Sequence, residues 1–71
     1  MKKYVVIFEK TTTGYSAYVP DLPGCIATGK TKPMVEKNIY EAILFHLEGL
    51  AEEGEDAPLS ISEAETLVFA A

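Results

Sequence analysis

The stretch that most constrains the fold is Tyr15–Cys25, in which an alternating, tyrosine-rich run ends in Pro-Asp-Leu-Pro-Gly. Pro20 has no N–H to donate to a sheet, so it is expected at the end of a strand. Pro23 presets φ for the first central position of a turn, and Gly24 can take the positive φ that a type II turn requires next. Asp21 can accept hydrogen bonds from the backbone that follows it. The stretch therefore predicts two strands joined by a stiff corner.

The residues around this corner predict a third strand and one long helix. Tyr4–Phe8 is rich in β-branched and aromatic residues and indicates a first strand, with Tyr15–Val19 the second and Cys25–Thr28 the third. Thr31 is a suitable N-cap for a helix that ends at Gly54.

The last segment, Thr66–Ala70, also has the composition of a strand. A right-handed return after the helix would place it beside the first strand and parallel to it. The predicted fold class is α+β in the order β-β-β-α-β, with a mixed four-stranded sheet and the helix on one face. Residues 1–71 are expected to form a single domain.

The helix carries apolar residues on two sides. Its core-facing positions are Val35, Ile39, Ala42, Ile43, His46 and Leu50, which recur at helical spacing. The opposite side carries Tyr40, Leu44 and Leu47 where charge would be expected on a solvent-facing helix. These three residues predict an interface in a homo-oligomer, a dimer or larger.

The size and charge of the chain narrow its partners. A 71-residue chain has a small core, and its single cysteine, Cys25, cannot form an intramolecular disulfide. A formal net charge of −5 disfavours direct binding of nucleic acid and favours a basic protein partner. With no apolar run of membrane-spanning length and no signal peptide, a cytoplasmic protein is expected.

No constellation of residues predicts catalysis. A two-metal nuclease needs converging carboxylates, and the candidates Glu9, Glu41 and Glu65 are equally well explained as solvated charge. His46 and Cys25 have no partner at a telling spacing and are interpreted as structural. We therefore expect no catalytic residue, no metal site and no cofactor.

The sequence GYSAYVPDLPGCIATGKT, followed by a helix with AILFHLEGL, resembles the N-terminal domain of HicB-type antitoxins. The resemblance extends from about Tyr4 to Gly54 and implies a partial ribonuclease H-like fold. It also implies an antitoxin of a type II toxin-antitoxin pair, which covers a small basic HicA-like mRNA-cleaving toxin and does no chemistry itself. Many HicB proteins carry a C-terminal DNA-binding domain; no basic segment follows the last predicted strand here, so we expect no direct DNA binding.

The predicted toxin contact lies at the corner and comprises Tyr15, Tyr18, Asp21, Leu22 and Pro23. Leu22 is expected to be an exposed apolar tip, and Asp21 to pair with a toxin lysine or arginine. Turn geometry alone explains Asp21 and Pro23 equally well. Two other functions remain open: an orphan HicB-like domain that self-associates or binds another protein, and a metal-dependent nuclease on a ribonuclease H-like fold.

Overall fold

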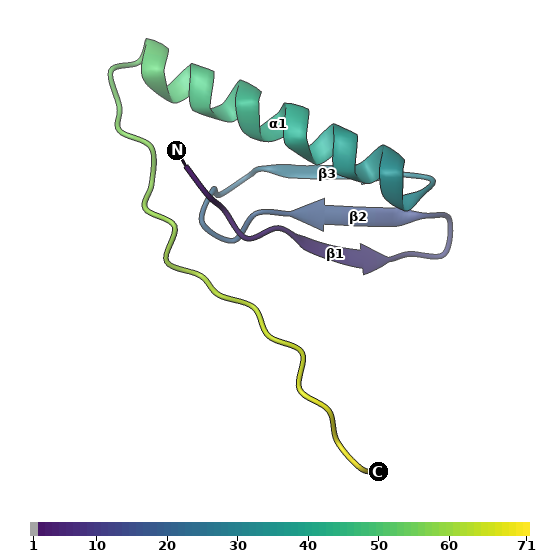
Figure 1. Cartoon of the computed structure of the whole chain (residues 1–71). Coiled ribbons are helices and arrows are strands. Elements are labelled where there is room, and N and C mark those ends of the chain that lie inside the picture. The colour runs from purple at the N-terminus through teal and green to yellow at the C-terminus, as the bar shows by residue number, and fades with distance from the viewer. Residues whose placement is uncertain (1) are drawn as a thin grey trace.

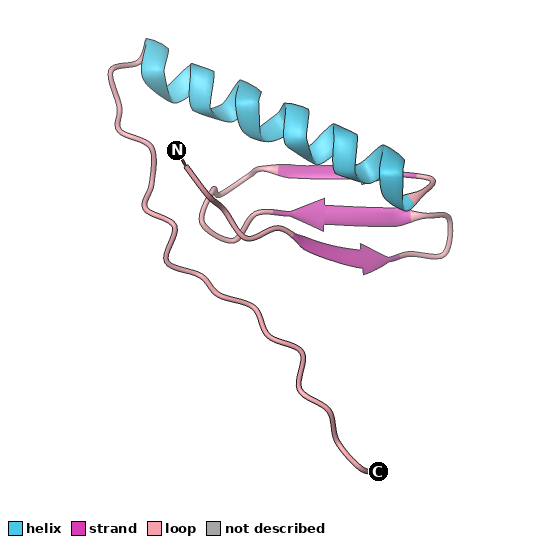
Figure 2. Ribbon diagram, viewed as in Figure 1, coloured by secondary structure: helices cyan, strands magenta, loops and turns pink. Residues whose placement is uncertain are grey.

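A computed structural model describes residues 2–71 and shows three strands followed by one helix (Figure 1). The strands are β1 (Ile7–Lys10), β2 (Tyr15–Tyr18) and β3 (Ile26–Gly29), and the helix is α1 (Lys32–Glu52). The three strands and the helix predicted from the sequence are thus confirmed, although β1 begins three residues later than expected (Figure 2).

The sheet is antiparallel throughout and has the order β1-β2-β3. Its register aligns Phe8 with Ala17 and Ala17 with Ala27, and these three residues belong to or pack against the core under α1. The neighbouring row, Ile7–Tyr18–Ile26, points to the opposite face because side chains alternate along a strand. One sheet face is therefore covered by α1, and the other carries an apolar row of its own.

Both ends of α1 are capped as the sequence predicts. Thr31 Oγ1 accepts a hydrogen bond from the Met34 N–H at 3.3 Å. At the other end Gly54 has φ 73°, and the Glu55 N–H donates to the Leu50 carbonyl at 2.9 Å. This is the Schellman arrangement, which satisfies helix carbonyls that have no partner within the helix.

The core lies between the corner, β2 and the first half of α1. Its buried residues are Ala17, Val19, Leu22, Cys25, Val35 and Ile39. Leu22 and Val35 are the largest fully buried side chains. The expectation that Leu22 is an exposed tip is therefore wrong.

Two consecutive turns explain why Leu22 is buried. The Leu22 N–H donates to the Val19 carbonyl at 3.1 Å, and the Cys25 N–H donates to the Leu22 carbonyl at 3.0 Å. Gly24 has φ 82°, as predicted for the second central residue of a type II turn. The double turn bends the corner so that Leu22 packs with Val35 and the rest of the core.

The prediction of a fourth strand at Thr66–Ala70 is wrong. Within residues 2–71 the sheet has three strands, and the chain after α1 has neither helix nor paired strand. Figure 1 shows the C-terminal end of the chain running away from the domain. The radius of gyration is 13.9 Å, against about 11 Å for a compact domain of this length. Strand composition makes the segment extended, but a strand forms only where an edge lies alongside to pair with it.

Candidate protein-binding surfaces

The five residues predicted to contact a partner do not form one surface. Tyr15 and Tyr18 lie on opposite faces of β2, because three positions separate them. Tyr15 is half-buried and packs against the core, whereas Tyr18 is exposed beside Ile26 on the face without a helix. Pro23 is exposed at the turn, and Leu22 is fully buried. Leu22 thus shapes the corner and presents no side-chain surface to a partner.

Asp21 holds the segment that follows α1. Its Oδ2 accepts hydrogen bonds from the Ile61 and Ser62 N–H groups, both at 2.9 Å. Its Oδ1 accepts a third from the Ser62 hydroxyl at 2.8 Å. A further contact, from the Tyr4 hydroxyl to the Pro58 carbonyl at 2.6 Å, fixes the same segment to the residues before β1. We call the hydrogen bonds between Asp21 and residues 61–62 the Asp21 latch.

The latch also sets the protonation of Asp21. The Ser62 N–H and hydroxyl, with the Ile61 N–H, hold the pKa of the Asp21 carboxyl below its ordinary value, because they stabilise the carboxylate. Asp21 was expected to close its own turn; in the structure its carboxylate instead accepts a hydrogen bond from a residue 40 positions along the chain. Sequence alone gave no signal for this pairing, since serines and backbone N–H groups occur throughout the chain.

The three residues of α1 that were predicted to form an oligomer interface do not all lie on its outer side. Tyr40 is 64% exposed and Leu44 48% exposed. Leu47 is half-buried and packs against the core, so it belongs with the core-facing side and not with the outer side. The outer apolar surface of α1 is therefore narrower than the sequence pattern suggested.

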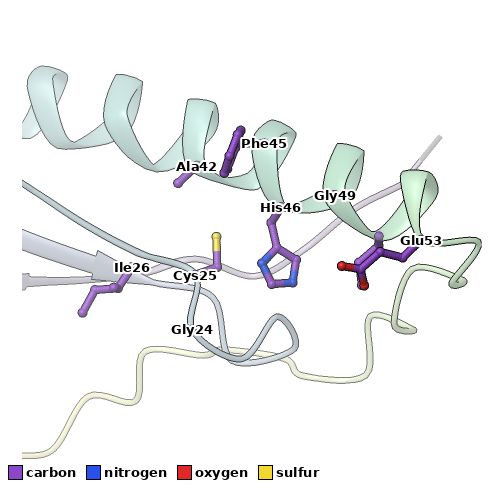
Figure 3. A pocket seen from close by; sticks show the side chains of 9 residues that line it. Gly24, Cys25, Ile26, Ala42, Phe45, His46, Gly49 and Glu53 are labelled. Atoms are coloured by element: carbon purple, nitrogen blue, oxygen red, sulfur yellow. The ribbon is translucent and has the colours of Figure 1, made fainter.

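A hollow of the surface lies between the corner and the second half of α1 (Figure 3). We call it the corner groove; it has a volume of about 430 Å³. It is lined by Gly24, Cys25, Ile26, Ala42, Phe45, His46, Gly49, Leu50 and Glu53. No sequence pattern reveals the groove, because its two walls are about 20 residues apart in the chain.

The groove combines an exposed aromatic side chain with a buried thiol. Phe45 is 78% exposed. Figure 3 shows His46 reaching from α1 toward the corner. Cys25 is buried, and desolvation raises the pKa of its thiol, which disfavours the reactive thiolate. The prediction that Cys25 is a packing residue agrees with this burial.

Charge is separated along the molecule. The end of α1 next to the groove and the residues just after it carry five acidic residues within nine positions: Glu48, Glu52, Glu53, Glu55 and Asp56. The opposite end carries Lys10, Lys30 and Lys32, which the sheet register and the start of α1 bring to the same side. The apolar groove thus lies at the acidic end.

Nothing in residues 2–71 forms a metal site. No group of three or more His, Cys, Asp or Glu side chains in this range could hold a metal ion, so Glu9, Glu41 and Glu65 do not converge. The convergence that would have favoured a nuclease is not found. Among the described residues no helix has the length and hydropathy needed to cross a membrane.

The fold and its surface define a class of molecule, a small α+β domain with an apolar groove beside an acidic helix end. The chain belongs to the HicB-like antitoxins: the family described as "HicB_like antitoxin of bacterial toxin-antitoxin system" matches residues 4–70. This confirms the resemblance seen in the sequence.

Two proteins from other organisms are similar to this chain in sequence. A "UPF0150 protein" of Thermoplasma acidophilum is 42% identical over 66 residues, which cover 92% of this chain and 96% of the relative. An "Uncharacterized 14.9 kDa protein in rep-hol intergenic region" of Haemophilus phage HP1 is 44% identical over 57 residues. That match covers 80% of this chain but only 43% of the phage protein.

The solved structure titled "HicA3 and HicB3 toxin-antitoxin complex" contains a chain similar to this one, with a TM-score of 0.70 and 35% identity. The match covers 84% of this chain and 70% of the other.

Proposed function

We propose that this chain is an antitoxin that binds and masks a small, basic, HicA-like mRNA-cleaving toxin. Membership of the HicB-like family supports the proposal, as does the similarity to a chain solved in a toxin-antitoxin complex. The net charge of −5 suits a basic partner. The observation that carries the proposal is the corner groove, an apolar hollow next to the acidic end of α1.

The corner groove and the acidic residues beside it have different roles in this proposal. Phe45 supplies apolar area that becomes desolvated when a toxin side chain enters the groove, which stabilises the complex. Glu48, Glu52 and Glu53 attract the lysines and arginines that an RNA-cleaving protein needs to hold phosphates. Covering those cations blocks RNA from the toxin without any reaction by the antitoxin.

The predicted corner residues keep a place in the proposal with altered roles. Tyr18 and Pro23 are exposed and remain direct contact residues. Leu22 acts by holding the corner in shape, and Asp21 by holding the segment after α1. Tyr15 supports β2 from the core side.

The test compares two aromatic residues of α1 that differ in position. Phe45→Ala removes the exposed groove aromatic, and we expect affinity for a HicA-like toxin to fall by about 10–30-fold, equivalent to about 1.4–2 kcal/mol. Tyr40→Ala is the matched control, because Tyr40 is 64% exposed and does not line the groove. Titration calorimetry measures affinity, and circular dichroism checks that both variants are folded.

The same titrations can reject the proposal. Equal affinities of wild type and Phe45→Ala would remove the groove from the interface. Failure of the wild type to bind the toxin at all would reject the antitoxin function and favour the alternative of an orphan HicB-like domain that associates with itself or another protein.

A further inference from the structure

The corner groove changes from apolar to acidic along its length. One stripe of α1 lines it, with members three or four positions apart: Ala42, His46, Gly49 and Glu53. The exposed ring of Phe45 lies beside the start of this stripe, and Glu53 stands at its end. Figure 3 shows His46 and Glu53 on the side of α1 that faces the corner. A ligand lying along the groove would therefore meet apolar surface first and a carboxylate last.

We propose that the corner groove receives an arginine side chain of the toxin, with the apolar stem beside Phe45 and the guanidinium at the Glu53 carboxylate. The inference rests on the proposed function and names the group that the groove takes from the partner. Phe45 and Glu53 are eight positions apart, about 12 Å along the axis of α1. Contact with both needs a long side chain with an apolar stem and a cationic tip, a description that only arginine and lysine fit.

The acidic residues beside the groove have no cation of their own chain to pair with. All six basic residues are lysines within residues 2–37, whereas residues 38–71 contain eight acidic residues and no lysine or arginine. The last turn of α1 also lacks a basic residue, although the carbonyl end of a helix favours a nearby cation. Glu53 is the C-cap of α1, so a cation from a partner that pairs with Glu53 would lie at this helix end.

Gly49 leaves the middle of the groove open. A Cβ placed on Gly49 would meet nothing within 4 Å, so packing among the described residues does not require a glycine here. Glycine is also less favourable than alanine inside a helix. The space that it leaves lies between Phe45 and Glu53, where the stem of the entering side chain would pass. Across the groove, the buried Cys25 offers a neutral wall to that stem.

The carboxylate at the end of the groove distinguishes arginine from lysine. A guanidinium is planar and can donate two parallel hydrogen bonds to one carboxylate, such as that of Glu53. It is also more weakly hydrated than an ammonium group, so it loses less when the groove displaces water from it. Lysine would bring the same charge as a compact, strongly hydrated group with no such paired geometry. The groove therefore favours arginine.

The first experiment uses the full chain without any toxin. An acetylated and amidated tripeptide, Ala-Arg-Ala, is titrated into the ¹⁵N-labelled chain, and matched peptides carry lysine or norleucine at the centre. The arginine peptide should give saturable shifts at the amides of Cys25, Phe45, Gly49 and Glu53, which line the groove. Its affinity should exceed that of the lysine peptide by about threefold and that of the norleucine peptide by about tenfold.

Variants locate the two ends of the contact. Glu53→Gln should weaken the arginine peptide by about threefold or more and leave the norleucine peptide unchanged. Gly49→Leu fills the groove with a good helix former and should abolish the shifts. Glu41→Gln is the matched control, because it removes the same charge from an exposed position of α1 that does not line the groove. Circular dichroism checks that each variant is folded.

Several results would overturn the inference: no saturable shift, equal affinities for the arginine and norleucine peptides, or equal losses in Glu53→Gln and Glu41→Gln. A lysine peptide that binds as tightly as the arginine peptide would refute the assignment to arginine. Toxin binding is measured separately, so the two proposals can fail independently. A chain that binds the toxin but not the arginine peptide retains the antitoxin function and loses this inference. A chain that binds the arginine peptide but not the toxin retains the groove chemistry and loses the antitoxin function.

Discussion

Leu22→Ala tests the largest departure from the sequence-based expectation. Leu22 is fully buried in the core, with an exposed fraction of 0%. Its neighbours belong to three separate elements, namely the corner, β2 and α1. Truncation to alanine removes apolar atoms from the centre of a core of only six buried residues.

The expected loss follows from the burial. Leucine-to-alanine changes at fully buried sites cost about 2–5 kcal/mol, and the upper part of that range applies where neighbours cannot collapse into the space. Leu22 is held by turns on both sides, so collapse is restricted. A domain this small rarely has more than about 3–5 kcal/mol of stability in total. We therefore expect Leu22→Ala to remove most of the free energy of unfolding.

Urea denaturation followed by circular dichroism at 222 nm measures this loss at a fixed protein concentration. Leu22→Met conserves volume and should cost less than about 1.5 kcal/mol, so it keeps a measurable transition. Leu59→Ala makes the same deletion at a site that is 81% exposed and should change stability by less than about 0.5 kcal/mol. If Leu22→Ala and Leu59→Ala shift the urea midpoint equally, Leu22 is not a core residue in solution and the reasoning fails.

Four further predictions concern the latch and two glycines. Asp21→Asn should raise the amide hydrogen-exchange rates of Ile61 and Ser62, because it weakens the acceptors of the latch. Since the pKa of Asp21 is lowered in the folded chain, the carboxylate stabilises the latch at neutral pH, and this contribution is lost as pH falls through the folded-state pKa. NMR shifts of the Ser62 amide should follow that titration. Unchanged shifts down to pH 2 would contradict it. Gly29→Ala should lower the thermal midpoint, because a Cβ there would lie 2.7 Å from the Val35 backbone nitrogen. Gly49→Ala meets nothing within 4 Å and lies inside α1, so it should raise stability by up to about 1 kcal/mol; a thermal midpoint lower than wild type would show that the site is not open.

Local chemistry accounts for the parts of the fold that were predicted correctly. Thr31 and Gly54 mark the ends of α1 through contacts within a few residues of themselves. Gly24 takes its positive φ because Pro23 and a tight turn require it. The family resemblance was likewise readable in the sequence, since its motifs are continuous stretches of the chain.

The residues whose positions were predicted wrongly, or not predicted, are those whose position depends on distant parts of the chain. Apolar Leu22 at a turn fits exposure or burial equally well until the double turn bends it toward Val35. The corner groove joins Ile26 to Phe45, and no periodicity connects a strand residue with a residue on the helix opposite.

What the sequence by itself determined is the set of local elements: three strands, the stiff corner and a capped helix, each specified by backbone preferences and by short-range hydrogen bonds. Only the tertiary structure decided that Asp21 holds Ser62, that the corner and α1 enclose a groove, and that Thr66–Ala70 has no strand beside it. The physical reason is that a strand and a groove are properties of pairs of segments, and the extended backbone of Thr66–Ala70 becomes a strand only when another edge satisfies its N–H and C=O groups.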